Sequence, residues 1–215
     1  MRITFVRPNL YNMRSSDALQ PLVFAILKGL TPSSIETRLY DERLEPIPFE
    51  EKTDLVAITV ETFTARRAYE IGDEFRKRGV PVVMGGYHAT FMPDEVLQHA
   101  DSVVIGDAEG LWQQVIADAK DKNLKPIYRQ SIHPGLKGLA YDRSIFKGKR
   151  YRPVTPVQYG RGCRFACDFC SIHAFYGKDL RQREIPEVVE EIERQNSRHV
   201  FLVDDNLFVD LDKAR

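Results

Sequence analysis

The sequence has only three cysteines, no net charge and no long apolar run, and each shortage excludes a class of protein. The cysteine count is odd and all three lie between Cys163 and Cys170, which argues against a disulfide framework. Lysine plus arginine and aspartate plus glutamate number 31 each, so no broad basic field favours a nucleic acid partner. No apolar run approaches the roughly 18 residues of a membrane span, and Met1 to Val6 lacks the apolar core of a secretory leader. We therefore expect a cytoplasmic protein of ordinary globular composition.

Short apolar segments alternate with amphipathic segments in the first part of the chain. Strands are expected at 3–6, 35–40, 54–60, 80–84 and 102–105, with helices at 19–30, 65–78, 93–98 and 111–119. Such alternation is typical of an α/β domain whose parallel sheet is covered on both faces. The sequence thus predicts a doubly wound, flavodoxin- or Rossmann-like sheet of five parallel strands within a domain of residues 1–122.

Polar or glycine-rich loops follow four of these strands. Because the carboxyl ends of parallel strands share one edge, where ligands bind in such folds, the loops predict a binding site. Glycines at this edge let a flat ligand approach the backbone closely, although ordinary turns would have the same composition. The candidate residues are Pro8, Asn9, Thr59, Glu61, Thr62, Gly85, Gly86, His88, Gly106 and Glu109.

The rest of the chain contains a connector and the beginning of a second domain. Residues 123–152 carry glycines, prolines and a local basic run, and are expected to form a linker. Within 153–215, strands are expected at 154–159 and 199–203 with a helix at 186–196 between them. This order predicts a β-α-β unit that opens a barrel.

The three cysteines are spaced C-x3-C-x2-C, at Cys163, Cys167 and Cys170. Three thiolates this close can converge on one metal centre. Iron–sulfur clusters are held by cysteine thiolates, and three of them would leave one iron open to a small molecule. Zinc is the alternative, because His173 could complete a Cys3His set.

This motif, with the aromatic Phe169 directly before the last cysteine and a strand before the loop, resembles the signature of the radical SAM enzymes. The resemblance implies that Cys163, Cys167 and Cys170 bind a 4Fe-4S cluster and that S-adenosylmethionine chelates the fourth iron. It also implies a partial TIM-like barrel. Asp204 and Asp205, at the end of the second barrel strand, stand where the family contacts the methionine amino group, and Phe169 is a further candidate contact.

The strand-end loops of the first domain resemble the cobalamin-binding domain that precedes many radical SAM domains. The resemblance rests on Arg7-Pro8-Asn9, on residues 85–90 and on residues 106–109. The motif D-x-H-x-x-G of the proteins that donate a histidine to cobalt is not present. His88 lies in a different loop and is therefore expected to make hydrogen bonds rather than to ligate cobalt.

Together these resemblances imply a cobalamin-dependent radical SAM enzyme that methylates an unactivated carbon of a small molecule. Flavodoxin or ferredoxin would be the electron donor, and no side chain is assigned a catalytic role beyond cofactor binding. Ring formation, as in the anaerobic porphyrin cyclases, has a similar architecture and stays open. A non-catalytic cobalamin-binding module and a zinc-stabilised interaction protein are the alternatives from other functional classes.

The length of the second domain raises a further expectation. Radical SAM barrels usually continue through about six strands, each with its helix. Here residues 212–215 look like the opening of another helix. We therefore expect an N-terminal fragment of a longer enzyme, with a stable first domain and a segment after about Tyr151 that is mobile or held by a partner. Alone, it is not expected to turn over.

Overall fold

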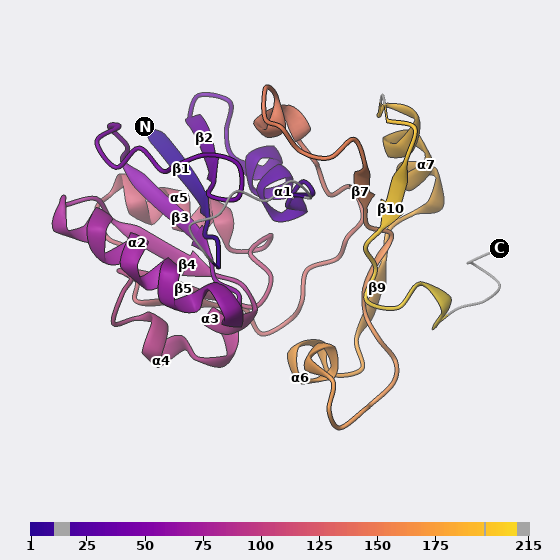
Figure 1. Cartoon of the computed structure of the whole chain (residues 1–215). Helices are drawn as coiled ribbons and strands as arrows, with labels where there is room; N and C mark the ends of the chain where they lie inside the picture. The colour runs from indigo at the N-terminus through magenta and orange to yellow at the C-terminus, as the bar shows by residue number, and fades with distance from the viewer. Residues whose placement is uncertain (11–17, 196, 210–215) are drawn as a thin grey trace. The chain divides into compact units, whose positions relative to one another are not determined.

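The computed structural model describes residues 1–10, 18–195 and 197–209 (Figure 1). The chain divides into two compact units. Unit 1 comprises residues 1–18, 23–133 and 140–150, and unit 2 comprises residues 19–22, 134–139 and 151–215. In the described part of the chain, no helix is long and apolar enough to cross a membrane.

Unit 1 is built on a parallel sheet of six strands. Its strands lie in the order β2-β1-β3-β4-β5-β6. The first five follow the order of a flavodoxin-like doubly wound sheet, which confirms the predicted fold class. The strands are β1 (Arg2–Arg7), β2 (Glu36–Asp41), β3 (Leu55–Thr59), β4 (Val82–Gly85), β5 (Ser102–Ile105) and β6 (Ile127–Arg129).

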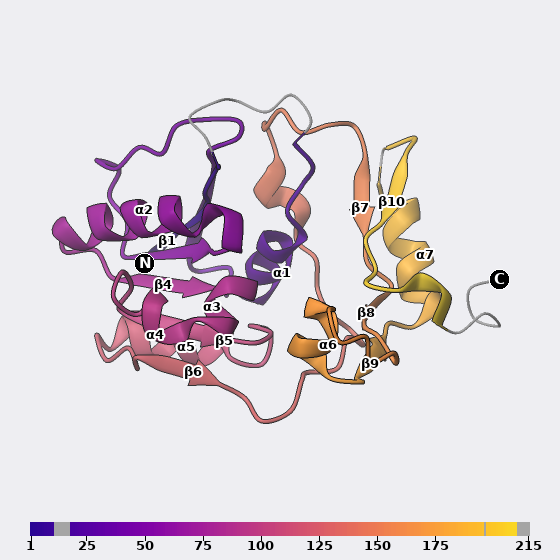
Figure 2. The same ribbon diagram turned by 60° about the horizontal axis from the view of Figure 1, so that its bottom comes forward.

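Helices cover both faces of this sheet (Figures 1 and 2). Side chains alternate between faces along a strand. One set, including Ile58 and Met84, packs against Ile71 of α2. On the other face Phe5 lies 5.5 Å from Phe24 of α1 and 5.9 Å from Trp112 of α5, measured between ring centroids. The helices are α1 (Leu22–Leu30), α2 (Ala65–Lys77), α3 (Tyr87–Phe91), α4 (Pro93–Val96) and α5 (Trp112–Lys120).

Two elements of unit 1 correct the sequence analysis. The sheet has a sixth strand, β6, in the stretch predicted to be a linker. The strand is only three residues long and buries only Tyr128, so it has no apolar run by which to recognise it. Residues 87–91, expected in a loop, form α3. The former linker also contains a 3₁₀ helix, Arg143–Phe146, which belongs to unit 1.

Unit 2 contains the predicted β-α-β arrangement. Strand β7 (Thr155–Val157) is followed by α7 (Ile185–Glu193) and by β10 (Val200–Leu202), which pairs with β7 in parallel. Figures 1 and 2 both show β7 and β10 side by side with α7 against them. A small core forms where Val157 and Tyr159 meet Val188 of α7.

Between β7 and α7 the chain makes an antiparallel hairpin that carries the cysteine loop. Its strands are β8 (Gly160–Gly162) and β9 (Leu180–Gln182), and the short helix α6 (Ser171–Tyr176) lies between them in sequence. The loop with the three cysteines thus starts from one strand of a hairpin and returns to the other.

Strand β10 is apolar but partly exposed. Val200, Phe201 and Leu202 are 39%, 52% and 40% exposed, and among the described strands β10 pairs with β7 alone. The predicted helix opening at 212–215 and the predicted end of α7 at Asn196 lie outside the described residues.

Candidate functional site

The carboxyl ends of the unit 1 strands lie at one edge of the sheet, as predicted. The register sets Val6 beside Ile58, and Thr59 beside Gly85, so the loops after β1, β3 and β4 emerge together. An ion pair links two of these loops, because Arg7 Nη2 lies 3.5 Å from Glu61 Oε1. The sheet therefore gathers the predicted loop residues at one edge of unit 1.

The loop after β2 joins the same edge, which the sequence analysis did not predict. Glu42 follows directly after β2, and its carboxylate accepts the backbone N–H of Asn9 at 3.2 Å. The Arg67 guanidinium contacts both oxygens of Glu42, with Nη2 2.7 Å from Oε1 and Nε 3.1 Å from Oε2. An acidic residue at the carboxyl end of the second strand was the signal available in the sequence.

The three positions occupied by glycine at this edge differ in how strictly the structure requires glycine there. Gly86 has φ +113°, and a Cβ added there would stand 2.9 Å from the carbonyl oxygen of Val60. Gly85 has no such restriction, because an added Cβ would meet Val104 at an ordinary 3.6 Å. Gly106 has φ +82° and donates its N–H to Thr90 Oγ1 at 3.0 Å. Gly86 is thus required by the fold itself.

His88 is buried and held by hydrogen bonds from two elements. Its Nε2 lies 2.9 Å from the Tyr69 hydroxyl and its Nδ1 3.4 Å from Thr62 Oγ1. The Tyr69 hydroxyl also donates to Glu95 Oε1 at 2.8 Å, and burial followed by this hydrogen bond raises the pKa of Tyr69. Both ring nitrogens of His88 therefore have partners within unit 1.

Exposed apolar side chains lie beside the polar edge loops, and the sequence analysis did not single them out. Phe63, in the 3₁₀ helix Thr62–Thr64 that follows β3, is 61% exposed. Phe91 and Met92, at the end of α3, are also exposed. The signal in the sequence was an aromatic residue within the hydroxyl-rich loop after a buried strand.

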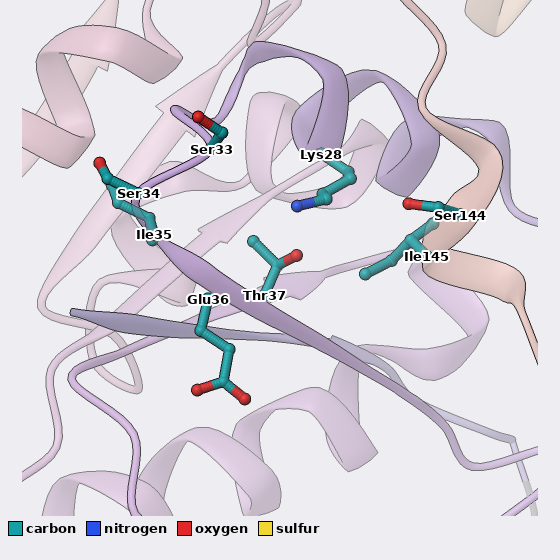
Figure 3. Close-up of a pocket in the computed structure, with 8 residues that line it drawn as sticks. All are labelled: Lys28, Ser33, Ser34, Ile35, Glu36, Thr37, Ser144 and Ile145. Atoms are coloured by element: carbon teal, nitrogen blue, oxygen red, sulfur yellow. The ribbon is translucent and has the colours of Figure 1, made fainter.

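A separate pocket of about 500 Å³ opens at the other end of the sheet (Figure 3). It is lined by the start of β2, the end of α1 and part of the 3₁₀ helix at 143–146, with Lys28 as its cationic side chain. Since β2 begins here, the pocket lies at the amino ends of the strands and is distinct from the loop edge. Its lining residues are Lys28, Ser33, Ser34, Ile35, Glu36, Thr37, Ser144 and Ile145.

The cysteine loop of unit 2 starts from a residue that must be glycine. Gly162 has φ +85°, and an added Cβ would meet the carbonyl oxygen of Asp179 at 2.0 Å. All three cysteines are free thiols, with Cys167 exposed and the other two half-buried. The backbone N–H of Cys170 donates to the Cys167 carbonyl at 3.2 Å, which makes a tight turn around the 89%-exposed Phe169.

The three thiols of this loop are the kind of ligand that an iron–sulfur cluster takes, although their sulfur atoms do not converge on one point here. Across residues 1–10, 18–195 and 197–209, no three His, Cys, Asp or Glu side chains converge on one point. His173 Nδ1 lies 2.9 Å from the Gly177 carbonyl oxygen, and His173 does not form a four-ligand set with the cysteines. Three free thiols on one partly exposed loop fit the cluster's ligand requirement, and the loop would have to close around it.

Asp204 and Asp205 hold the start of the cysteine loop through its backbone. Asp204 accepts the N–H groups of Tyr159, at 3.2 Å, and of Gly160. Asp205 Oδ2 accepts the N–H of Gly162 at 2.7 Å. Burial raises the pKa of Asp204, while its backbone hydrogen bonds act in the opposite direction. These contacts give both carboxylates a loop-holding role beside the cofactor contact that the sequence predicts.

Asn206 extends this arrangement to a sulfur atom. Its side-chain Nδ2 donates to Cys163 Sγ at 3.5 Å. The sequence analysis assigned Asn206 no role. Its contact with Cys163 depends on how the chain turns after β10, which no local pattern encodes.

Comparisons with known proteins match both units. Residues 32–116 match the family model of the B12 binding domain. A bacteriochlorophyllide d C-8(2)-methyltransferase of Chlorobaculum tepidum is 35% identical over 211 residues, covering 89% of this chain and 47% of the relative. The C-12(1)-methyltransferase of the same organism is 32% identical over 185 residues, covering 83% and 41%.

Structural comparison gives a match over nearly the whole chain. The radical S-adenosylmethionine methyltransferase TsrM from Kitasatospora setae, solved with cobalamin and a [4Fe-4S] cluster bound, aligns with a TM-score of 0.77 at 18% identity. The match covers 99% of this chain and 49% of TsrM. The chain therefore spans about half the length of the relatives it matches.

Proposed function

We propose that the chain serves a radical methylation of an unactivated carbon, because it belongs to the cobalamin-binding radical SAM family and corresponds to the cofactor-binding part of that family's proteins. One observation carries the proposal: a B12 binding domain is followed in the same chain by a C-x3-C-x2-C loop between the strands of a β-α-β unit. Two relatives named as methyltransferases are 35% and 32% identical, whereas two named as anaerobic magnesium-protoporphyrin IX monomethyl ester cyclases are 28% identical, which favours methyl transfer over ring formation.

In this proposal the cysteine loop holds the cluster. Cys163, Cys167 and Cys170 supply three thiolates, and the fourth iron is left for S-adenosylmethionine. When bound, the cluster supplies the electron that cleaves S-adenosylmethionine, and cobalamin supplies the methyl group. Phe169, which is 89% exposed and directly precedes Cys170, is a proposed further contact to S-adenosylmethionine. The protein's own contribution is to fix the loop and to orient both cofactors.

The loop edge of unit 1 is the proposed cobalamin site. Backbone at Gly85 and Gly106 leaves room for a flat macrocycle, and the hydroxyls of Thr59 and Thr62 offer hydrogen bonds to its amide side chains. The exposed ring of Phe63 supplies apolar contact area. The other proposed contacts are Pro8, Asn9, Glu61, Gly86 and Glu109.

His88 has a supporting role in this site. Its two nitrogens are engaged by Tyr69 and Thr62, so the ring braces the loop after β4 against α2. Cobalt would therefore receive no imidazole from this residue. We propose that Asp204 and Asp205 act mainly by holding the cysteine loop, and that they would also contact S-adenosylmethionine.

The substrate and the electron donor follow from the same chemistry. A small protein such as flavodoxin or ferredoxin would deliver single electrons to the cluster. The relatives are named for methylating bacteriochlorophyllide d, which supports a small-molecule substrate of the tetrapyrrole class.

Two binding measurements test the proposal. Anaerobically reconstituted chain is reduced, and its electron paramagnetic resonance spectrum is recorded with and without S-adenosylmethionine; we expect a changed signal, because the fourth iron is open. Equilibrium dialysis against cob(II)alamin is expected to show one site of micromolar affinity or tighter. An unchanged cluster signal together with no cobalamin uptake would refute the proposed function.

A further inference from the structure

The side chain of Asn206 is fixed at both of its polar ends. Its Oδ1 accepts the backbone N–H of Phe208 at 3.2 Å, and its Nδ2 donates to Cys163 Sγ at 3.5 Å. An amide has one accepting and one donating end. The Phe208 contact therefore determines which end faces the sulfur, and that end is the donor.

The residues around Asn206 hold the same part of the chain. Asp204 accepts the N–H groups of Tyr159 and Gly160, and Asp205 accepts that of Gly162. Gly162 directly precedes Cys163, so three consecutive side chains after β10 contact the start of the cysteine loop. The two aspartates hold backbone N–H groups, and Asn206 contacts the sulfur of Cys163.

We propose that Asn206 is a positioning residue for Cys163, which orients this thiolate for cluster binding and stabilises the reduced cluster through an N–H···S hydrogen bond. The inference rests on the proposed function, because it concerns the cluster that the cysteine loop would hold. Hydrogen bonds to the sulfurs are one of the factors that set the potential of an iron–sulfur centre. A donor favours the more negative, reduced state, so its loss lowers the reduction potential.

Asparagine is the residue that fits both contacts. Aspartate has the same shape and would still accept from the Phe208 N–H, but it would place an anionic oxygen against a thiolate. Leucine has a similar size and removes the donor without adding a charge. The two substitutions therefore test the same contact, one by removing the donor and the other by also adding a negative charge. Groups that orient a metal ligand without binding the metal often affect metal affinity as well as reduction potential.

The first experiment measures the one-electron reduction potential of the cluster in the reconstituted 215-residue chain. Asn206→Leu is expected to shift the potential to a more negative value, and Asn206→Asp to shift it further, because a negative charge is added. Glu190→Gln, an exposed charge change on α7, is the control and should leave the potential unchanged. An Asn206→Leu protein with full iron content and wild-type potential would overturn the inference while the proposed function stands.

The second experiment tests the contact in the protein without a cluster. In nitrogen-15 correlation spectra, Cys163→Ala should shift the side-chain amide resonances of Asn206, whereas Cys167→Ala, at the exposed cysteine, should not. If the wild-type chain takes up no iron, the proposed function fails and the cluster part of the inference fails with it, while these spectra still decide whether Asn206 contacts the Cys163 sulfur. Unchanged side-chain amide resonances of Asn206 in Cys163→Ala would refute the inference.

Discussion

The Asp205 carboxylate accepts the backbone N–H of Gly162 at 2.7 Å, and this bond ties the end of β10 to the residue that opens the cysteine loop. The two residues are 43 positions apart in sequence. Gly162 itself cannot be replaced without moving Asp179, whose carbonyl oxygen is 2.0 Å from the place of a Cβ. The loop that would hold a cluster is thus fixed at its start by backbone geometry and by the second strand of the β-α-β unit.

Removing the Asp205 carboxylate should loosen the start of the loop. Asp205→Ala removes the acceptor, and a hydrogen bond of this kind at an exposed site contributes about 1 kcal/mol, which corresponds to roughly fivefold faster amide exchange at Gly162. Asp205→Asn keeps a carbonyl oxygen and should exchange at an intermediate rate. Equal exchange rates at Gly162 in the wild type and Asp205→Ala would show that the bond does not hold the loop.

The two adjacent glycines of unit 1 should respond differently to the same substitution. Gly86→Ala combines positive φ with a contact of 2.9 Å to Val60, and we expect a loss of about 1–3 kcal/mol in the free energy of unfolding. Gly85→Ala meets only ordinary contacts, so it should keep the wild-type melting temperature and weaken cobalamin binding instead. Thermal melts and equilibrium dialysis of the two variants give both readings. Wild-type melting of Gly86→Ala, or unaltered cobalamin affinity of Gly85→Ala, would contradict this division.

A hydrogen bond made by Tyr128 of β6 should make the stability of the protein depend on pH. The Tyr128 hydroxyl donates to Asp118 Oδ2 at 2.7 Å, and this bond holds the pKa of Asp118 below its usual value. A carboxyl whose folded-state pKa is lowered stabilises the protein above its unfolded pKa of about 3.9, and the stabilisation is lost as the pH falls through the folded pKa. Tyr128→Phe should therefore lower the melting temperature by a few degrees at neutral pH, and the difference should shrink in acid.

The alkaline side gives a second reading of the same pair. Burial raises the pKa of Tyr128 to about 12, with the Asp118 hydrogen bond as the next cause. The neutral phenol is favoured in the folded state, so this contribution is present below the unfolded pKa of 10.0 and is lost as the pH rises toward 12. Tyr128→Phe should remove that alkaline loss. On the acid side, a difference in melting temperature between the wild type and Tyr128→Phe that stays constant from pH 3 to 7 would refute the assignment of the lowered Asp118 pKa to the Tyr128 hydrogen bond.

Cobalt should receive no protein imidazole in this chain. His88 and His133 lie next to the proposed edge; the nitrogens of His88 are held by Tyr69 and Thr62, and His133 Nδ1 lies 3.7 Å from Asp107 Oδ2. The electron paramagnetic resonance spectrum of the bound cob(II)alamin should therefore show no splitting from a protein nitrogen, and nitrogen-15 labelling of histidine should not change it. His88→Ala should weaken binding only indirectly, through the loop after β4. A label-dependent splitting would show that a histidine does bind cobalt.

Sequence reasoning worked where a residue's neighbours are set by its own pattern. The apolar runs around Phe5, Val56 and Val103 identify central strands, because a strand buried on both faces needs apolar residues throughout. Strand β6 was missed because only Tyr128 is buried in it. The exposure of Phe201 cannot be read from its apolar neighbours in sequence, since exposure depends on what packs against a strand rather than on its own residues.

In the candidate site, too, features set by local sequence could be predicted and contacts between distant segments could not. Spacing alone identified the three cysteines, because all lie within one loop. The bond from Asn206 to Cys163, and those from Asp204 and Asp205 to the residues before it, join segments more than 40 residues apart. Such contacts follow from the parallel pairing of β7 with β10, which brings the two loop regions together. They could not be read from either segment by itself.

The most direct test of the cysteine site is the metal and sulfide content of the anaerobically reconstituted chain. The cluster interpretation predicts about four irons with matching acid-labile sulfide in the wild type and in His173→Ala, and loss of most of both in Cys163→Ala, Cys167→Ala or Cys170→Ala. A colourless protein that holds one zinc ion, and loses it in His173→Ala, would contradict the interpretation.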